Sequence, residues 1–377
     1  MSVPTTELPT IADLPRTTRA AVLTAHGEPL TLQDLPLPSE IEPGAALVRI
    51  ACTTLCGTDI EIWEGRMTFP GMLPMVLGHE MVGEIVATGP DARDALGRPL
   101  APGDRIGWSE STCGECHGCV VLREPVACAH RGYGFLQRAD VPPFATAGLS
   151  EYAYVTPGAA KLLLPASVKD TWASMAGCAA KTVLRAFERA GRLRPGSSVV
   201  VQGAGALGIF ATAVAKISGA GQVITVGAPA SRLALAGRFG ADAVVDFRDG
   251  PVVDQVMALT GGRGADHVFD FAGAPSVGPD AIGMAAQRGT IAIVGSTGPA
   301  GDGFPLSTIM GKELTVVGSL NGDISDYSRA IDFFTAFADR FPWDDLFSTP
   351  VGLADASTKI ADMHHLDEVK AVIDPRL

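Results

Sequence analysis

Residues 198–208 read Ser-Val-Val-Val-Gln-Gly-Ala-Gly-Ala-Leu-Gly, an apolar strand that runs directly into a glycine turn, and an apolar helix pattern follows at 209–217. The turn has the spacing GxGxxG. Gly203 permits a tight turn, Gly205 lets the backbone approach a pyrophosphate, and Gly208 allows close helix packing. Phosphates would lie at the helix N-terminus, where free N–H groups and the helix dipole favour anions. This stretch therefore predicts dinucleotide binding.

Strand and helix patterns continue to alternate on the C-terminal side of the turn. Apolar strand patterns recur at residues 223–227, 243–246, 267–271, 290–295 and 314–318. A helix pattern near residues 232–239 separates the first two of them. Such alternation is typical of a parallel sheet with helices on both faces. We predict a doubly wound α/β domain over residues 181–320.

The end of the second strand bears on which dinucleotide binds. An acidic residue usually holds the adenosine ribose hydroxyls there, but this strand ends in Gly227-Ala228-Pro229 and has no carboxylate. Arg232 could contact a 2′-phosphate, or it could equally be a solvated helix residue. The choice between NAD and NADP therefore stays open. The candidate cofactor-binding residues in this part of the chain are Thr182, Gly203, Gly205, Ala206, Leu207, Gly208, Gly227, Arg232 and Val294.

The N-terminal part has a different pattern, in which glycine and proline separate short apolar runs. These runs lie at residues 46–51, 81–88, 104–107 and 151–155. Short strands with frequent turns predict a small antiparallel barrel. Further along, Ser325 is a candidate N-cap for a helix over 326–338, and residues 369–373 have a strand pattern. We predict that residues 321–377 complete a first domain formed by residues 1–180.

Four of the seven cysteines crowd into one short run, at Cys113, Cys116, Cys119 and Cys128. CxxC steps bring neighbouring sulfurs within reach of one tetrahedral ion, with Zn–S distances of about 2.3 Å. The alternatives are a disulfide pair or chance clustering. The run predicts a zinc lobe over residues 113–128.

A second group of metal-binding residue types lies upstream. Cys56 and His79 offer a thiolate and an imidazole, which Zn²⁺ favours as ligands. Asp59 and Glu80 are carboxylates close beside them, and a ligating histidine needs an acceptor for its second N–H. A catalytic zinc needs a third protein ligand and an open fourth position, for which Cys178 is the best candidate. Taken alone, each of these cysteines and the histidine could be a core residue.

Together these residues resemble the zinc-containing medium-chain dehydrogenase/reductase superfamily, which includes alcohol, polyol and threonine dehydrogenases. The most specific match is Gly78-His79-Glu80-x-x-Gly83 followed by Gly89, the zinc signature of the family. The spacing of 25 residues from Cys178 to Gly203 also matches. The resemblance covers nearly the whole chain. It implies a GroES-like β-barrel catalytic domain interrupted by a Rossmann dinucleotide-binding domain, and a four-cysteine lobe that is a separate structural zinc site.

The resemblance also implies roles around a catalytic zinc held by Cys56, His79 and Cys178. Thr58 matches the hydroxyl that bonds the reacting oxygen and passes its proton outward. Asp59 would be the partner of His79, and Glu80 would exchange onto zinc. Glu61 stands where some relatives continue the proton relay with a histidine, so the relay uses this carboxylate or ends at water.

Besides Glu61, two further departures limit what the resemblance implies. Some relatives carry a cation after the first ligand, where this chain has Gly57. Lys370 matches another phosphate-contacting basic position, but it could be only an exposed strand lysine. The gap between Cys119 and Cys128 is one residue longer than usual in the lobe, and His130 is an alternative to Cys128 as a ligand, although we favour the cysteine.

The resemblance implies a zinc-dependent oxidoreductase that interconverts an alcohol and its ketone or aldehyde with NAD or NADP, and two zinc ions per chain. The residues expected at the cleft wall suggest an apolar secondary alcohol; they are Trp63, Phe69, Met72 and Trp108. Two alternatives are a zinc-free quinone or enoyl reductase on the same scaffold and a catalytically inactive nucleotide-binding relative. The strand at 314–318 lies where related enzymes pair sheets, so we expect a homodimer or homotetramer.

The composition narrows the range of partners and compartments. A net charge of −12 argues against nucleic acids and acidic membranes as partners. No apolar run is long enough to span a bilayer, and the first nineteen residues contain no apolar core of a signal peptide. A zinc-type cysteine cluster fits a reducing compartment, so we expect a cytoplasmic protein with a small-molecule substrate.

Overall fold

The structure is a computed structural model that describes residues 14–274, 276–295 and 305–377. Its chain forms two compact units. The first unit comprises Met1–Cys178, Asp323–Thr335 and Phe347–Leu377, and the second comprises Ala179–Gly322 and Ala336–Leu346. No helix in the described part of the chain has both the length and the apolar character needed to cross a membrane.

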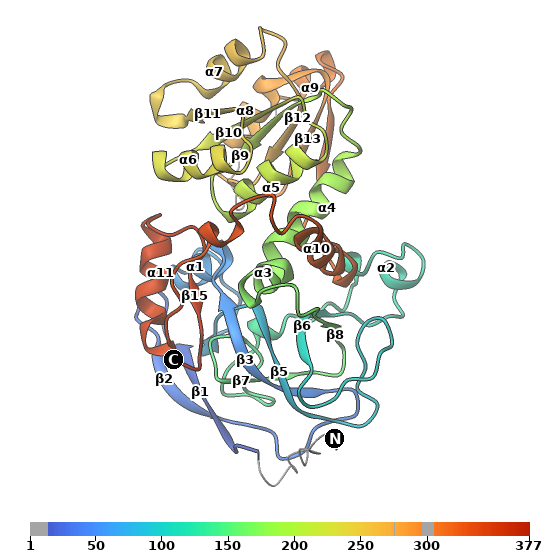
Figure 1. The fold of residues 1–377 in the computed structure, drawn as a ribbon, viewed down its shortest axis with the longest axis vertical. Helices are drawn as coiled ribbons and strands as arrows, with labels where there is room; N and C mark the ends of the chain where they lie inside the picture. The colour runs from blue at the N-terminus through green and yellow to red at the C-terminus, as the bar shows by residue number, and fades with distance from the viewer. Residues whose placement is uncertain (1–13, 275, 296–304) are drawn as a thin grey trace, which may run out of the picture. The chain divides into compact units, whose positions relative to one another are not determined.

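The first unit is built on antiparallel sheets (Figure 1). One sheet has the strand order β2-β1-β4, and the other has the order β15-β3-β5-β6-β8 with β7 also paired to β3. The strands are β1 (Thr17–Leu23), β2 (Thr31–Pro36), β3 (Ala46–Thr54), β4 (Met75–Val76), β5 (Glu80–Thr88), β6 (Arg105–Ser111), β7 (Tyr152–Val155), β8 (Ala159–Leu163) and β15 (Val372–Ile373). The helices are α1 (Gly57–Trp63), α2 (His117–Val120), α3 (Asp170–Met175), α10 (Ile324–Ala336) and α11 (Ala356–His364).

The second unit is a single six-stranded sheet in which every pairing is parallel. Its strands are β9 (Ser198–Gln202), β10 (Gln222–Gly227), β11 (Ala243–Asp246), β12 (Ala265–Asp270), β13 (Ala285–Ile293) and β14 (Thr315–Gly318). The order β11-β10-β9-β12-β13-β14 is the doubly wound arrangement of a Rossmann fold. The predicted fold class is therefore confirmed. The edge strand β14 is largely exposed, and the expected pairing of chains there stays a prediction.

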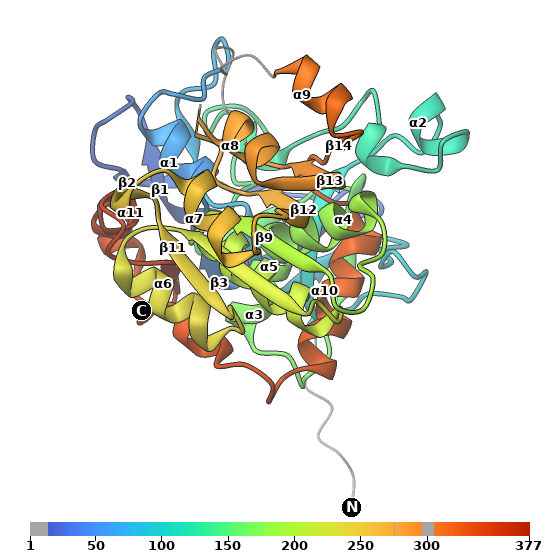
Figure 2. The ribbon, with the colours of Figure 1, turned by 90° about the horizontal axis from the view of Figure 1, so that it is seen from above.

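Helices cover both faces of this parallel sheet. Those on one side are α4 (Lys181–Ala190), α5 (Ala206–Ile217) and α6 (Ala230–Arg238), and those on the other are α7 (Val252–Leu259) and α8 (Val277–Met284), as Figure 2 shows. A short helix, α9 (Leu306–Gly311), precedes β14. The inner strands β9, β10 and β12 are buried and rich in valine and isoleucine, as expected for a sheet that is covered on both sides.

Two boundaries differ from the sequence-based expectation. Residues 336–346 belong to the second unit, not the first, because Trp343 is buried against Phe239 at 5.3 Å and Phe210 at 5.7 Å between ring centroids. Helix α10 begins before Ser325, and its cap is Asp323. One carboxylate oxygen of Asp323 accepts the backbone N–H of Ser325 at 2.8 Å and also its hydroxyl at 2.6 Å, so the serine is a donor and not the cap.

Helix α10 supports the segment that carries Cys178. Its residue Tyr327 is fully buried, and the Tyr327 hydroxyl donates to the backbone carbonyl of Ala173 at 2.9 Å. The helix α3 then widens into a π-helical turn, Ala176–Ala180. A β-carbon at Gly107 would lie 1.9 Å from the Tyr327 hydroxyl oxygen, so this glycine makes room for the contact. A carbonyl diverted from the regular helix ladder is a known cause of such irregular turns.

We predict that Tyr327→Phe lowers the free energy of unfolding by about 1–3 kcal/mol, because the buried carbonyl of Ala173 loses its donor. Tyr133→Phe is the matched control, because the Tyr133 hydroxyl makes no hydrogen bond to any described residue, and we expect it to change stability by less than about 0.5 kcal/mol. Urea unfolding measures both. Equal midpoints for the two variants would contradict this account of the turn.

Candidate metal and cofactor sites

Four candidate ligands meet at one edge of the larger antiparallel sheet. The sulfurs of Cys56 and Cys178, a ring nitrogen of His79 and a carboxylate oxygen of Glu80 all lie within 4.8 Å of one another. Strand β3 pairs with β5 so that Thr54 faces Glu80, which brings Cys56, two residues after β3, close to His79, directly before β5. Cys178 lies in the π-helical turn Ala176–Ala180. The predicted ligand set is therefore assembled from three distant segments.

The Asp59 carboxylate holds two of these segments together. It is fully buried, and one oxygen accepts the backbone N–H of Cys56 at 2.9 Å. The other oxygen accepts the backbone N–H of Gly78 at 3.0 Å and lies 3.3 Å from Nδ1 of His79. An acceptor on Nδ1 leaves Nε2 of the ring to a metal, which is the usual arrangement of a ligating histidine. The position agrees with the role expected for Asp59.

The chemistry of these donors suits zinc. The pKa of the Cys56 thiol lies well below its usual value, chiefly because Cys178 donates a hydrogen bond to it and further because of His79, although burial acts in the opposite direction. The thiolate is the form that binds metals. In a tetrahedral site with Zn–S bonds of about 2.3 Å, ligand sulfurs lie about 3.8 Å apart, and a separation below 4.8 Å needs only small shifts. The residues therefore fit the ion.

A buried ion pair fixes the Glu80 carboxylate. Both carboxylate oxygens lie 2.6 Å from Nζ of Lys370, and one of them also accepts the hydroxyl of Thr54 at 2.5 Å. The Thr54 hydroxyl also lies 2.9 Å from the hydroxyl of Ser174, which donates to the Glu80 backbone carbonyl at 2.6 Å. Burial raises the pKa of Glu80 to about 7, although the Lys370 ammonium acts in the opposite direction. All of these groups lie in the first unit.

This ion pair revises the expectation for Lys370. The sequence offered a phosphate contact or an exposed strand lysine, but the side chain is only 1% exposed and lies against Glu80. An ammonium in this position already has a buried carboxylate as its counter-ion. The structure therefore connects Lys370 to the metal-ligand cluster.

Two further predicted residues flank the cluster. The Thr58 hydroxyl oxygen lies 3.9 Å from the sulfur of Cys56, close to the ligands as expected. The Glu61 carboxylate accepts a 3.4 Å hydrogen bond from Arg66 and is not among the clustered ligands. Burial raises the pKa of Glu61, with Arg66 opposing the shift. A proton relay through Glu61 stays a prediction.

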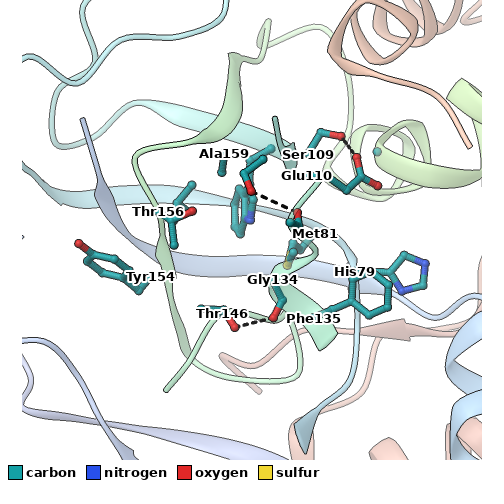
Figure 3. Close-up of a pocket in the computed structure, with 15 residues that line it drawn as sticks. His79, Met81, Ser109, Glu110, Gly134, Phe135, Thr146, Tyr154, Thr156 and Ala159 are labelled. Atoms are coloured by element: carbon teal, nitrogen blue, oxygen red, sulfur yellow. Dashed lines mark hydrogen bonds between the residues drawn. The ribbon is translucent and has the colours of Figure 1, made fainter. Parts of the chain in front are cut away.

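A small cavity of about 50 Å³ adjoins His79 (Figure 3). The Phe135 ring lies 4.5 Å from the His79 ring between centroids, and Ser109 and Glu110 also line the cavity. The sequence analysis missed these three residues, because no motif marks them, although Ser109 directly follows the expected Trp108. That tryptophan does line the cavity.

The other residues expected at a cleft wall have different surroundings. Met72 is buried in the hydrophobic core of the first unit, where Trp63 also packs. Phe69 is exposed. Among the residues expected at that wall, only Trp108 borders the cavity beside His79.

The four-cysteine lobe also has the geometry of a metal site. All four sulfurs lie within 4.8 Å of one another, with 3.6 Å between Cys116 and Cys119 and 3.6 Å between Cys113 and Cys128. A disulfide would need about 2.05 Å, whereas thiolates on one tetrahedral zinc lie about 3.8 Å apart. The backbone N–H of His130 donates to Cys128 at 3.4 Å, and the imidazole of His130 is not in the cluster. The preference for Cys128 agrees with this arrangement.

The glycine turn of the second unit has the shape of a phosphate cradle. Gly203 adopts φ +112°, and a β-carbon on Gly208 would lie 1.8 Å from the Gly203 carbonyl oxygen. Gly205 has no atom within 4 Å of where a β-carbon would lie, so the space above the turn is open. Helix α5 begins at Ala206, and the N–H groups of its first turn have no partner within the helix. The backbone therefore fits a pyrophosphate group.

The structure also explains why the second strand ends without a carboxylate. A β-carbon on Gly227 would lie 2.4 Å from the β-carbon of Ala204, so only glycine fits against the turn. Arg232 lies in the first turn of α6 and is partly exposed. Thr182 is buried in the first turn of α4, and Val294 follows β13, where its N–H donates to the backbone carbonyl of Asp270 at 3.0 Å.

Two family models match this chain. Residues 42–166 match the alcohol dehydrogenase GroES-like domain, and residues 206–336 match the zinc-binding dehydrogenase domain. These ranges contain Cys56 and His79 of the first cluster, the four-cysteine lobe, and the second half of the glycine turn, from Ala206 to Gly208.

Individual relatives match over most of their length. The chain is 34% identical over 362 residues to a probable alcohol dehydrogenase of Mycobacterium tuberculosis, which covers 92% of this chain and 94% of the relative. It is 30% identical over 345 residues to the 5-exo-hydroxycamphor dehydrogenase of Pseudomonas putida, with coverage of 89% and 93%. A crystal structure from Sinorhizobium meliloti, assigned to the zinc-binding dehydrogenases and bound to NADP, superposes with a TM-score of 0.80 at 27% identity, with coverage of 95% and 99%.

The assembled ligand clusters, the phosphate cradle and these matches agree with one another. A zinc-binding dehydrogenase that uses a nicotinamide cofactor needs a cluster of cysteine and histidine ligands and a glycine turn that binds the cofactor phosphates. The chain belongs to the zinc-containing medium-chain dehydrogenase/reductase superfamily and is an alcohol oxidoreductase of that superfamily.

Proposed function

We propose that this chain is a zinc-dependent dehydrogenase of apolar secondary alcohols that transfers hydride to or from NAD or NADP. The observation that carries the proposal is the convergence of Cys56, His79, Cys178 and Glu80 on one point. Asp59 holds the segments of Cys56 and His79 in place through the backbone N–H groups of Cys56 and Gly78. A pair of cysteines with only a structural role would not need this buried carboxylate. A zinc-free reductase would have no use for this donor set.

The residues of the cluster have separate tasks in this proposal. Zinc, when bound, supplies a Lewis acid, and the nicotinamide ring supplies the hydride acceptor or donor. Cys56, His79 and Cys178 would hold the ion, with Asp59 fixing the ring of the histidine. The Thr58 hydroxyl, beside Cys56, would accept the proton of the alcohol and pass it outward. The second cluster, in the four-cysteine lobe, would hold a zinc that stabilises the fold.

Glu80 would be an additional ligand that binds the metal ion only at some stages of the reaction. Its carboxylate is near enough to the other three groups to join them, yet Lys370 holds both of its oxygens and Thr54 donates to one of them. Both contacts would have to weaken for the carboxylate to approach the ion. We therefore propose that Lys370 positions Glu80 and does not itself contact the cofactor.

The surroundings of His79 support an apolar substrate. Phe135 and Trp108 line the cavity beside it, so this side of the ligand cluster is aromatic. The relative from Pseudomonas putida is named for a hydroxycamphor, a secondary alcohol on an apolar skeleton. A substrate of this class would place its hydroxyl at the cluster and its hydrocarbon against the aromatic rings.

The ribose end of the cofactor site would accept a 2′-phosphate. No carboxylate ends β10, and Gly227 cannot be replaced by an acid without a collision with Ala204. Arg232 lies five residues beyond, in the first turn of α6, where an anion is also favoured by the helix. We propose that NADP binds at least as tightly as NAD.

The first test of this function is a panel of alcohols and ketones run with NAD and NADP in parallel. We expect turnover with apolar secondary alcohols, and turnover lower by about tenfold or more with small primary alcohols, because these bury less apolar surface. Cofactor binding without turnover across the panel would contradict the proposal and favour the inactive relative. Reduction of quinones or enoyl compounds alone would favour the zinc-free reductase.

Metal analysis of three cysteine variants tests the two zinc sites. We expect about two zinc ions per chain in the wild type and about one in Cys56→Ala. Turnover of Cys56→Ala should fall by more than roughly 10–100-fold, which is the loss expected when only a residue that supports a metal ligand is removed. Cys116→Ala should lose the other ion. Cys52→Ala is the matched control, because this buried thiol lies near Cys56 but outside both clusters, and it should keep both ions. A single zinc in the wild type would refute the two-site proposal.

Affinity measurements on Arg232→Ala test the ribose end. Loss of a charged contact to a phosphate should weaken NADP binding by about tenfold or more and leave NAD binding nearly unchanged. Gly227→Asp should weaken both cofactors, since the new side chain collides with the turn. Equal losses of NAD and NADP in Arg232→Ala would show that this arginine does not read the 2′-phosphate.

A further inference from the structure

A cavity of about 400 Å³ lies in the second unit, at the edge of the sheet opposite the glycine turn. Ser197 directly precedes β9. His267 lies near the start of β12 and pairs with Thr290 of β13. The glycine turn follows the carboxyl end of β9. Five strand residues separate the two edges, which corresponds to about 16 Å along the sheet. The cavity is therefore distinct from the cofactor site.

The lining of this cavity is strongly cationic. Arg192, Arg194 and Arg288 all border it. Among the described residues, neither Arg192 nor Arg194 has a side-chain hydrogen bond or ion pair, and Arg288 makes only an exposed 3.5 Å contact with Glu313. Three exposed arginines thus border one cavity in a chain whose net charge is −12.

The acidic residue in the lining does not neutralise these arginines. Asp266 lies within 2.6 Å and 3.0 Å of two nitrogens of Arg263, and its carboxylate also accepts the backbone N–H of Ser198 at 2.8 Å. These contacts, the Arg263 hydrogen bond first, hold the pKa of Asp266 below its usual range. Its charge is therefore already balanced by a fourth arginine.

A buried histidine without a partner completes the lining. His267 is nine-tenths buried, and its Nδ1 has no hydrogen-bond partner in the described structure. Burial lowers the pKa of His267, and the charge of Arg194 lowers it further although Asp266 opposes both. The ring is thus neutral near pH 7 and keeps one unused donor or acceptor. Buried polar atoms rarely lack a partner unless a ligand or water supplies one.

The strand pairing at this edge of the sheet is also irregular. Between the pairs Ala265–Ala285 and His267–Thr290, four residues of β13 lie opposite one residue of β12. Within this bulge, Arg288 adopts φ +61°, a left-handed conformation that costs free energy for a residue other than glycine. The strained conformation places an arginine at the cavity where glycine would be the conformationally easy choice.

We propose that this cavity binds a small phosphorylated metabolite, with its phosphate between Arg192, Arg194 and Arg288. Phosphate presents several charged oxygens, which suits guanidinium groups that border one cavity from two segments, whereas a carboxylate offers only two. The Ser197 and Thr290 hydroxyls add neutral donors. The volume exceeds what a phosphate alone needs and lies within the range of small-molecule sites, so an organic portion also fits.

The test is calorimetric titration of the full chain with inorganic pyrophosphate in phosphate-free buffer, with the cofactor site saturated so that the glycine turn is occupied. We expect one further pyrophosphate per chain, bound less tightly as ionic strength rises. The double variant Arg192→Ala/Arg194→Ala should bind about 100-fold more weakly. Arg340→Ala is the matched control, an exposed arginine of the same unit outside the cavity, and should bind as the wild type does.

Arg288→Gly separates binding from folding. Glycine tolerates the left-handed backbone, so thermal unfolding should occur at the same temperature or higher, while pyrophosphate binding weakens by about tenfold or more. No binding to the wild type at millimolar pyrophosphate, or equal affinity in the double variant, would overturn the proposal. Succinate bound as tightly as pyrophosphate would overturn the assignment to a phosphate. Each measurement is of binding, so its outcome does not depend on the proposed alcohol dehydrogenase activity.

Discussion

The metal-ligand cluster depends on one buried carboxylate. Asp59 accepts the backbone N–H groups of Cys56 and Gly78 and lies against the ring of His79, so a single side chain sets the positions of two ligands from different segments. A charged acceptor that is fully buried is costly unless every lone pair is used, and this one has three polar neighbours. Its burial makes the arrangement rigid, and rigidity is what a metal site requires of its supporting residues.

A second buried charge ties the C-terminal segment to the same cluster. Lys370 meets Glu80 from a position 290 residues further along the chain. Either charge alone in this interior would be strongly destabilising, so the pair obliges the returning segment to dock wherever Glu80 is placed. Tyr327, from the other returning segment, contacts α3 just before Cys178. The chain that follows the Rossmann unit therefore completes the metal site as well as the first unit.

The parallel sheet separates two kinds of anion chemistry. At its carboxyl edge, glycines clear space and backbone N–H groups would face the cofactor phosphates, which needs no charged side chain. At its amino edge, arginine side chains supply the charge and the backbone is strained to deliver one of them. The first edge carries a motif because glycine is required at fixed spacing. The second carries none, since arginines can converge from any loop.

Local chemistry in the sequence determined much of this protein. The strand–turn–helix over residues 198–217, the parallel alternation after it and the two cysteine-containing ligand sets all depend on residue type and spacing, and the structure contains each of them. Tertiary structure alone decided the rest. The burial of Lys370 against Glu80 and the contact of Phe135 with His79 arise between side chains whose proximity no spacing rule encodes. Packing chose those partners, because each buried polar group had to find its counterpart in the folded chain.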